Sequence, residues 1–173
     1  MQINPTELSL FLYTLPNNLI EGSEIIKLYE QHLSRKSIKD FIHISLSTSL
    51  RKPINKYIHN KDEFINTYIP KVSLGRAQGN TQAILEYVTS EQCSTQLTLV
   101  LYDESHKDAF LSRLKNSGKK AKCKIITAEE FALVSDFSLY PQVIIDCPYS
   151  MEFIPQINLI PFVTHSKIII VGS

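Results

Sequence analysis

Five short apolar runs in the second part of the chain constrain its fold more than any other feature. Each run is rich in Ile, Val and Leu, and a segment with helical periodicity separates it from the next. Strands have this composition when both of their faces are buried, as in a parallel sheet that is covered by helices. The sequence therefore predicts strands at Lys71–Leu74, Leu97–Tyr102, Cys123–Thr127, Val143–Cys147 and Lys167–Gly172.

The segments between the apolar runs are long enough to form helices. The predicted helices are Thr81–Thr89, His106–Lys115 and Ala128–Val134. Such regular alternation predicts a three-layer α/β domain with a mainly parallel sheet of about five strands and right-handed crossovers. We place this domain at residues 71–173.

Residues 1–70 have a different pattern and are predicted to form a mainly helical N-terminal segment. Their apolar residues recur at helical spacing after two capping candidates, Ser23 and Asn60. The stretch Phe41–Leu50 fits a short strand as well as a helix, because polar and apolar residues alternate along part of it. Later in the chain, four prolines predict loop corners: Pro141, Pro148, Pro155 and Pro161.

The composition predicts a globular protein without a membrane span. With 43% hydrophobic and 20% charged residues, the chain is expected to form a globular core. No apolar run reaches the roughly 18 to 20 residues that span a bilayer, and the polar start lacks the features of a signal peptide. The expected location is the cytoplasm, with no membrane association. A net charge of +1 gives no overall attraction to nucleic acid, although basic clusters occur at Ser34–Lys39, Arg51–Lys56 and Lys115–Lys124.

The segment KVSLGRAQGNTQAILEYV, Lys71–Val88, joins a predicted strand to a predicted helix through a loop with two glycines. In such an arrangement, backbone N–H groups of the loop and of the helix N-terminus form an anion site. The phosphate-binding motif is G-x-x-x-x-G-K-[ST]. Here Gly79 and Thr81 occupy the second glycine and hydroxyl positions, Gly75 is displaced by one residue, and Asn80 stands where the lysine belongs.

A second signal lies downstream in PQVIIDCPYS, where an apolar run leads to Asp146. An aspartate at the end of such a strand holds magnesium in nucleotide hydrolases, and the acidic residue after it activates the attacking water. Cys147 occupies the position of that acidic residue.

The order of GRAQGNT, VIIDCP and KIIIVGS resembles the ATPase core of phage terminase large subunits and related helicase-like P-loop proteins. The resemblance covers residues 71–173. It implies a site for ATP, with Mg²⁺ at Thr81 and Asp146. The residues that it assigns to cofactor binding are Gly75, Arg76, Gln78, Gly79, Asn80, Thr81 and Asp146.

Two departures from the family pattern, Asn80 and Cys147, predict impaired catalysis. The resemblance then implies a degenerate P-loop protein of viral, specifically phage, DNA metabolism or packaging, acting in the host cytoplasm. Such a protein binds nucleotide weakly or without turnover and regulates or contacts a protein or nucleic-acid partner. The resemblance assigns no definite catalytic residue and offers Asp146 as a candidate.

Two alternatives stay open. The first is an active ATPase or helicase-like motor subunit, in which Arg76 or a cation from a partner replaces the lysine. The second is a structural interaction module without nucleotide, in which Asn80 or Thr81 only caps a helix. In that case the N-terminal segment would bind a protein or a DNA end, the latter through Arg35, Lys36, Arg51 and Lys52.

One further cluster of polar residues, Asp103, Ser105 and His106, has the residue types of a hydrolase triad. Neighbours along a helix start rarely meet in triad geometry, and the sequence has no G-x-S-x-G motif. The cluster predicts a helix N-terminus with Asp103 or Ser105 as its cap.

Overall fold

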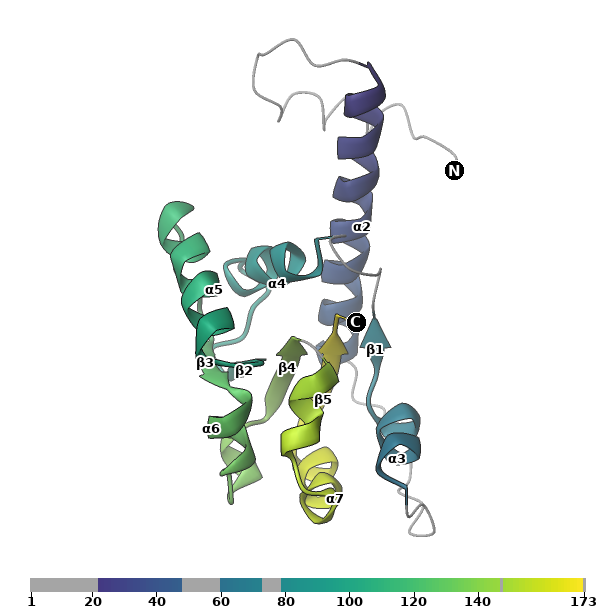
Figure 1. The fold of residues 1–173 in the computed structure, drawn as a ribbon, viewed down its shortest axis with the longest axis vertical. Helices are drawn as coiled ribbons and strands as arrows, with labels where there is room; N and C mark the ends of the chain where they lie inside the picture. Colours follow the sequence, from purple (N-terminus) through teal and green to yellow (C-terminus); the bar gives the residue numbers. More distant parts are fainter. Residues whose placement is uncertain (1–21, 48–59, 73–78, 147, 173) are drawn as a thin grey trace.

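The computed structural model describes residues 22–47, 60–72, 79–146 and 148–172. In these residues it contains one five-stranded sheet and six α-helices (Figure 1). The strands are β1 (Lys71–Val72), β2 (Leu97–Leu101), β3 (Lys124–Thr127), β4 (Gln142–Asp146) and β5 (Lys167–Val171). The α-helices are α2 (Gly22–Ser47), α3 (Lys61–Tyr68), α4 (Asn80–Val88), α5 (Glu104–Asn116), α6 (Ala128–Ala132) and α7 (Gln156–His165). Two 3₁₀ helices complete them, η1 (Phe137–Leu139) and η2 (Pro148–Phe153).

The sheet has the strand order β1-β5-β4-β2-β3, and every neighbouring pair is parallel. The predicted five-stranded parallel α/β sheet is therefore confirmed. Val171 of β5 is in register with Val72 on one side and with Asp146 on the other. Because all strands are parallel, their carboxyl ends lie at one edge of the sheet, and β1, β5 and β4 end there at the same level.

Two hydrophobic clusters cover the two faces of the sheet, because successive side chains of a strand point to opposite faces. The first cluster contains Leu99 and Ile144 of the sheet and the buried residues of α2, α4 and α5. The second contains Val100 and Ile145 and the buried residues of α3, α6 and α7. Helices thus lie on both faces, as the apolar strand composition predicted.

Helix α2 packs its Ile38, Ile42 and Leu46 into the first cluster, where all three are almost fully buried. Their spacing of four residues places them on one side of a helix. This stripe explains why the ambiguous stretch from Phe41 is helical as far as Ser47, the last residue described there. Lys167 of β5 also donates a hydrogen bond from Nζ to the Leu46 carbonyl, at 3.0 Å.

The predicted boundary at residue 70 does not coincide with a boundary of the core. Helix α2 shares the first cluster with α4, and α3 contributes Phe64 and Ile65 to the second. Asn60 caps α3, as predicted, by accepting hydrogen bonds from the backbone N–H groups of Asp62 and Glu63. The described parts of residues 1–70 are helices that pack on the sheet, and the division into two domains stays a prediction.

Helix α7 is the main element that the sequence did not predict. Pro161, expected at a loop corner, lies inside this helix, so that prediction is wrong. A proline there removes one backbone donor from the helix. Leu159 and Phe162 are completely buried, and the Phe162 ring packs against Phe131 at 4.9 Å and Phe137 at 5.1 Å between ring centroids. Burial of this apolar side of the helix outweighs the lost hydrogen bond.

Among the described residues, no helix combines the length and the apolar character that a membrane span requires.

Candidate functional site

The N-terminus of α4 lies after the carboxyl end of β1, where the sequence predicted an anion site. Its N-cap is Gly79, which has the left-handed backbone conformation (φ 87°, ψ 20°) that glycine adopts readily. No side chain caps the helix at this position, and its first turn contains no acidic residue. Asn80 is the first helical residue, so neither Asn80 nor Thr81 is the N-cap that the interaction-module alternative assumed. The end of α4 therefore keeps the partial positive charge of its first N–H groups.

The side chains of Thr81 and Asp146 meet at the carboxyl edge of the sheet. Thr81 Oγ1 donates a hydrogen bond to Asp146 Oδ2 at 3.3 Å, although the two residues are 65 positions apart. Thr81 belongs to the first turn of α4, and Asp146 is the last residue of β4. The contact joins the two motifs that the sequence singled out separately.

The carboxyl group of Asp146 lies in an unfavourable environment for its charge. Burial raises the pKa of Asp146 to about 6, while the Thr81 hydrogen bond and the charges of His106 and Arg113 act in the opposite direction. A carboxyl group whose pKa is raised by burial beside a specific hydrogen-bond partner makes Asp146 a candidate functional residue.

The position of Asp146 in the sheet also favours ligand binding. Strands β4 and β2 are neighbours, but the helices that follow them, α7 and α5, lie on opposite faces of the sheet. In open α/β sheets, such a reversal creates a crevice outside the carboxyl ends of the two strands, where ligands bind. Asp146 lies at this point on β4.

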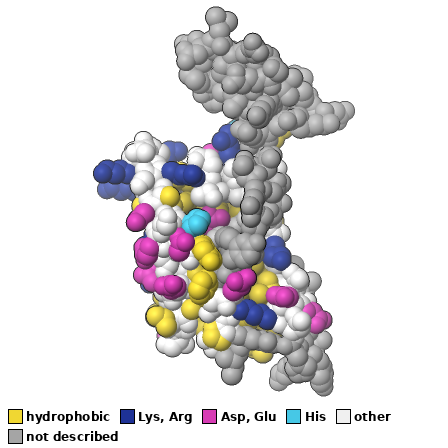
Figure 2. All heavy atoms as spheres, viewed as in Figure 1, with side chains coloured by type: hydrophobic (Ala, Val, Ile, Leu, Met, Phe, Trp, Pro, Cys, Tyr) yellow, Lys and Arg dark blue, Asp and Glu magenta, His cyan; other side chains and the backbone are white. Residues whose placement is uncertain are grey.

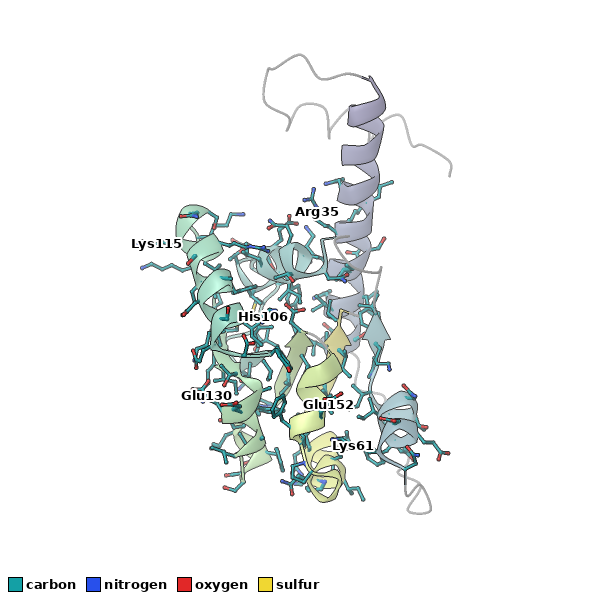
Figure 3. The ribbon with its side chains drawn as sticks, in the orientation of Figure 1. Arg35, Lys61, His106, Lys115, Glu130 and Glu152 are labelled. Carbon is teal, nitrogen blue, oxygen red and sulfur yellow. The ribbon has the colours of Figure 1, made fainter. Side chains whose placement is uncertain are left out.

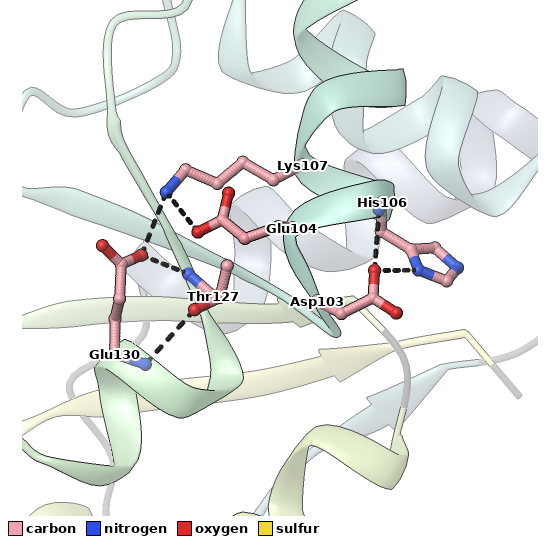
Figure 4. Close-up of polar contacts among 6 residues, drawn as sticks. All are labelled: Asp103, Glu104, His106, Lys107, Thr127 and Glu130. Atoms are coloured by element: carbon pink, nitrogen blue, oxygen red, sulfur yellow. Dashed lines mark hydrogen bonds and ion pairs between the residues drawn. The ribbon is translucent and has the colours of Figure 1, made fainter.

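The residues that follow β2 lie next to the carboxyl end of that strand, beside β4. Asp103 is the N-cap of α5, and its Oδ1 accepts hydrogen bonds from the backbone N–H and from Nδ1 of His106, both at 2.8 Å (Figure 4). These hydrogen bonds hold the pKa of Asp103 below its usual value. The prediction that this cluster is a helix N-terminus is confirmed, and of the two cap candidates Asp103 is the N-cap. The hydrogen bond from Nδ1 orients the His106 ring, and the other ring nitrogen, Nε2, points away from Asp103.

A third cluster of polar side chains, at the end of β3, stabilises the helices around it. Thr127 and Glu130 form a capping box at the start of α6. Lys107 of α5 bridges Glu130 at 3.1 Å and Glu104 at 3.3 Å, which links α5 to α6 (Figure 4). These contacts satisfy one another, so they leave no group directed toward a ligand.

The structure describes only part of the predicted site. Gly79, Asn80, Thr81 and Asp146 lie in the described residues, and the last two are in contact. Gly75, Arg76 and Gln78 fall outside them, and so does Cys147.

Sequence reasoning missed Arg35 as a neighbour of this site. A Cβ atom placed on Gly79 would lie 3.2 Å from Arg35 Cγ and 3.3 Å from Cδ, so the arginine stem crosses directly over the N-cap of α4. Figure 3 shows Arg35 on α2, close to α4. The sequence indicated only that Ser34–Lys39 is basic. The pattern Ile38, Ile42, Leu46 could have shown which side of α2 faces the core, but not which element lies there.

Oxygen donors such as those of Thr81 and Asp146 suit hard cations, among them Mg²⁺, Ca²⁺ and Mn²⁺. The described residues contain no group of three or more His, Cys, Asp or Glu side chains that could hold a metal ion. Magnesium needs few protein ligands, because it keeps several waters and binds phosphate oxygens of the substrate. The Thr81 hydroxyl and the Asp146 carboxylate are hard oxygen donors of this kind.

On the face shown in Figure 2, the acidic and the basic side chains of the described residues lie mostly in different places. Acidic side chains gather on part of this face, and lysines and arginines lie mainly above them. Five exposed lysines lie at the end of α5, in the segment that follows it and at the start of β3: Lys115, Lys119, Lys120, Lys122 and Lys124. Of the four basic residues proposed to contact DNA, Arg51 and Lys52 lie outside the described residues, and Arg35 contacts Gly79.

Comparison with known proteins found no matching family model, no matching curated protein and no matching solved structure.

Proposed function

We propose that this chain is a P-loop-like nucleotide-binding protein, in which the N-terminus of α4 binds phosphate and the Thr81–Asp146 pair holds Mg²⁺. The observation that carries the proposal is the contact between Thr81 Oγ1 and Asp146 Oδ2. In P-loop proteins, a hydroxyl from the phosphate loop and an aspartate from a second motif hold the metal ion together. Magnesium bound there would neutralise charge on the phosphates.

The other features of the site support the same proposal. The N-terminus of α4 has neither a side-chain cap nor an acid in its first turn, which suits the binding of an anion. The register of the strands brings the end of β1, which leads toward the glycine-rich segment, to the level of Asp146. The resemblance to terminase-like and helicase-like ATPases adds motif order to this geometry.

The substitutions argue for binding without efficient hydrolysis. Asn80 offers no positive charge at the position of the lysine that stabilises the transferring phosphoryl group. Electrostatic stabilisation of this kind is worth a few kcal/mol, or about 100-fold or more in rate. We therefore propose a regulatory or interaction role in viral DNA metabolism or packaging, with nucleotide as the ligand that controls it.

The first test compares two threonines at opposite ends of α4, Thr81 in its first turn and Thr89 at its C-cap. Thr81→Val removes the hydroxyl next to Asp146, and we expect it to weaken Mg²⁺-dependent ATP binding about 10-fold or more, as loss of a metal ligand or of its hydrogen bond does. Thr89→Val is the control, because the Thr89 hydroxyl donates only to the Leu85 and Glu86 carbonyls at the other end of α4. Isothermal titration with ATP, with and without Mg²⁺, measures both variants.

Equal affinity of the Thr81 and Thr89 variants would contradict the proposed metal site. Phosphate release measured on the same samples separates binding from hydrolysis. We expect no release above background. Turnover that disappears in Thr81→Val would instead favour the active ATPase.

A further inference from the structure

The side chain of Arg35 is held at the N-terminus of α4 by the packing of α2. Lys39, one turn further along α2, forms an ion pair with Glu86 of α4 at 3.1 Å between Nζ and Oε2. Ile38 and Ile42 share a hydrophobic cluster with Ala83 and Ile84. These contacts fix the position of α2 along α4, and Arg35 then passes over Gly79.

The positive charge of Arg35 has no counter-charge in the described part of the chain. Its Nε is buried and forms no hydrogen bond, and no carboxylate there lies within ion-pair distance of its guanidinium. The adjacent helix end is also positive and has no acidic residue in its first turn. The buried Nε lacks a hydrogen-bond partner, and an anion bound between the guanidinium and the helix end would be stabilised by both positive groups.

We infer that Arg35 is the cation that contacts the phosphates of a bound nucleoside di- or triphosphate, in place of the lysine that Asn80 replaces. This inference rests on the proposed function. A guanidinium suits the role, because its planar donors can bind two phosphate oxygens at once. The charge comes from α2, so neither Arg76 nor a partner protein is needed to supply it.

The experiment compares Arg35→Gln with Lys36→Gln by isothermal titration with Mg²⁺-ATP, Mg²⁺-ADP and adenosine. Lys36 is the adjacent residue of α2 and is exposed, so its variant removes the same charge from the same helix. We expect Arg35→Gln to weaken binding of both nucleotides about 10-fold or more, as the loss of a charge-assisted hydrogen bond does, and to leave adenosine binding unchanged. Lys36→Gln should stay within about twofold for every ligand. Arg35→Lys should restore part of the affinity.

A second substitution, at Gly79, tests the contact between Arg35 and the N-terminus of α4. Gly79→Ala places a methyl group against the Arg35 stem. Gly118→Ala is the control, because Gly118 also has a left-handed backbone conformation (φ +67°) that alanine rarely adopts, but its added methyl group would have no atom within 4 Å. Both variants should lose stability, but only Gly79→Ala should lose nucleotide affinity.

The two proposals fail in different ways. If the folded wild type binds Mg²⁺-ATP and Arg35→Gln binds it equally well, the role of Arg35 is overturned and the nucleotide site stands. If the folded wild type binds none of the nucleotides, both proposals are overturned. If Arg35→Gln weakens adenosine binding as much as ATP binding, Arg35 supports the fold of the site and does not contact phosphate.

Discussion

Asp146→Asn is expected to make the protein more stable at neutral pH and to abolish its Mg²⁺-dependent nucleotide binding. Burial raises the pKa of Asp146 from 3.8 to about 6 in the folded protein, so the folded state binds the proton more tightly than the unfolded chain does. Stability contributed by this group is therefore greatest below about pH 4, falls as the pH rises to about 6, and stays low above it. The neutral amide of asparagine avoids the buried charge.

The size of this effect follows from the two pKa values. The difference between 3.8 and about 6 corresponds to at most about 3 kcal/mol, and we expect a gain in the free energy of unfolding of about 1 to 3 kcal/mol near pH 7.5. The gain should shrink as the pH falls from about 6 and should vanish below 3.8, where Asp146 becomes protonated in the unfolded state as well. Urea unfolding at a series of pH values measures the difference. Asp108→Asn, at an exposed position of α5, is the control and should change stability by less than about 0.5 kcal/mol.

The same substitution removes the charge that Mg²⁺ requires. We expect the affinity for Mg²⁺-ATP to fall about 100-fold or more, since a magnesium site has few protein ligands. A variant that is more stable and has lost its ligand identifies Asp146 as a residue retained for binding. A variant that is less stable at neutral pH would instead show that the carboxylate is structural.

Ile42→Ala is expected to cost about 2 to 5 kcal/mol of stability, the usual cost of truncating a fully buried isoleucine to alanine. Ile42 is completely buried where α2 packs on the sheet. Ile44→Ala on the same helix is the control, because Ile44 is 62% exposed, and its cost should stay below about 1 kcal/mol.

The form of the unfolding curve carries as much information as its midpoint. If α2 and the sheet share one core, Ile42→Ala shifts a single transition that both far-ultraviolet circular dichroism and tyrosine fluorescence report. Separate transitions, with only the earlier one shifted, would show that the helices before residue 70 fold apart from the sheet.

The sheet could be predicted from the sequence because its signal is local. Runs such as those ending at Leu101 and Asp146 are rich in Leu, Val and Ile, and their burial on both faces requires helices on both sides. Helix α7 could not be predicted in this way. Pro155 and Pro161 indicate a break in the chain, and only the tertiary contacts of Phe162 show why a helix forms there.

Part of the candidate site could likewise be predicted from local sequence, and part could not. Thr81 and Asp146 follow predicted strands, and parallel strands end at one edge of the sheet, so their proximity follows from the order of the motifs. Arg35 belongs to a helix whose position on the sheet no local pattern specifies. Its contact with Gly79 depends on how α2 packs against α4, a long-range choice that the basic cluster alone does not reveal.

The most direct test of the central claim follows the backbone amides at the start of α4 by ¹H–¹⁵N correlation spectroscopy during titration with Mg²⁺ and tripolyphosphate. We predict saturable shifts that are largest for Gly79, Asn80 and Thr81, that include Asp146, and that weaken when Mg²⁺ is withheld. Amides at these positions that do not respond to millimolar tripolyphosphate in the folded protein, or shifts confined to the exposed lysines after α5, would contradict the claim that this helix end binds phosphate.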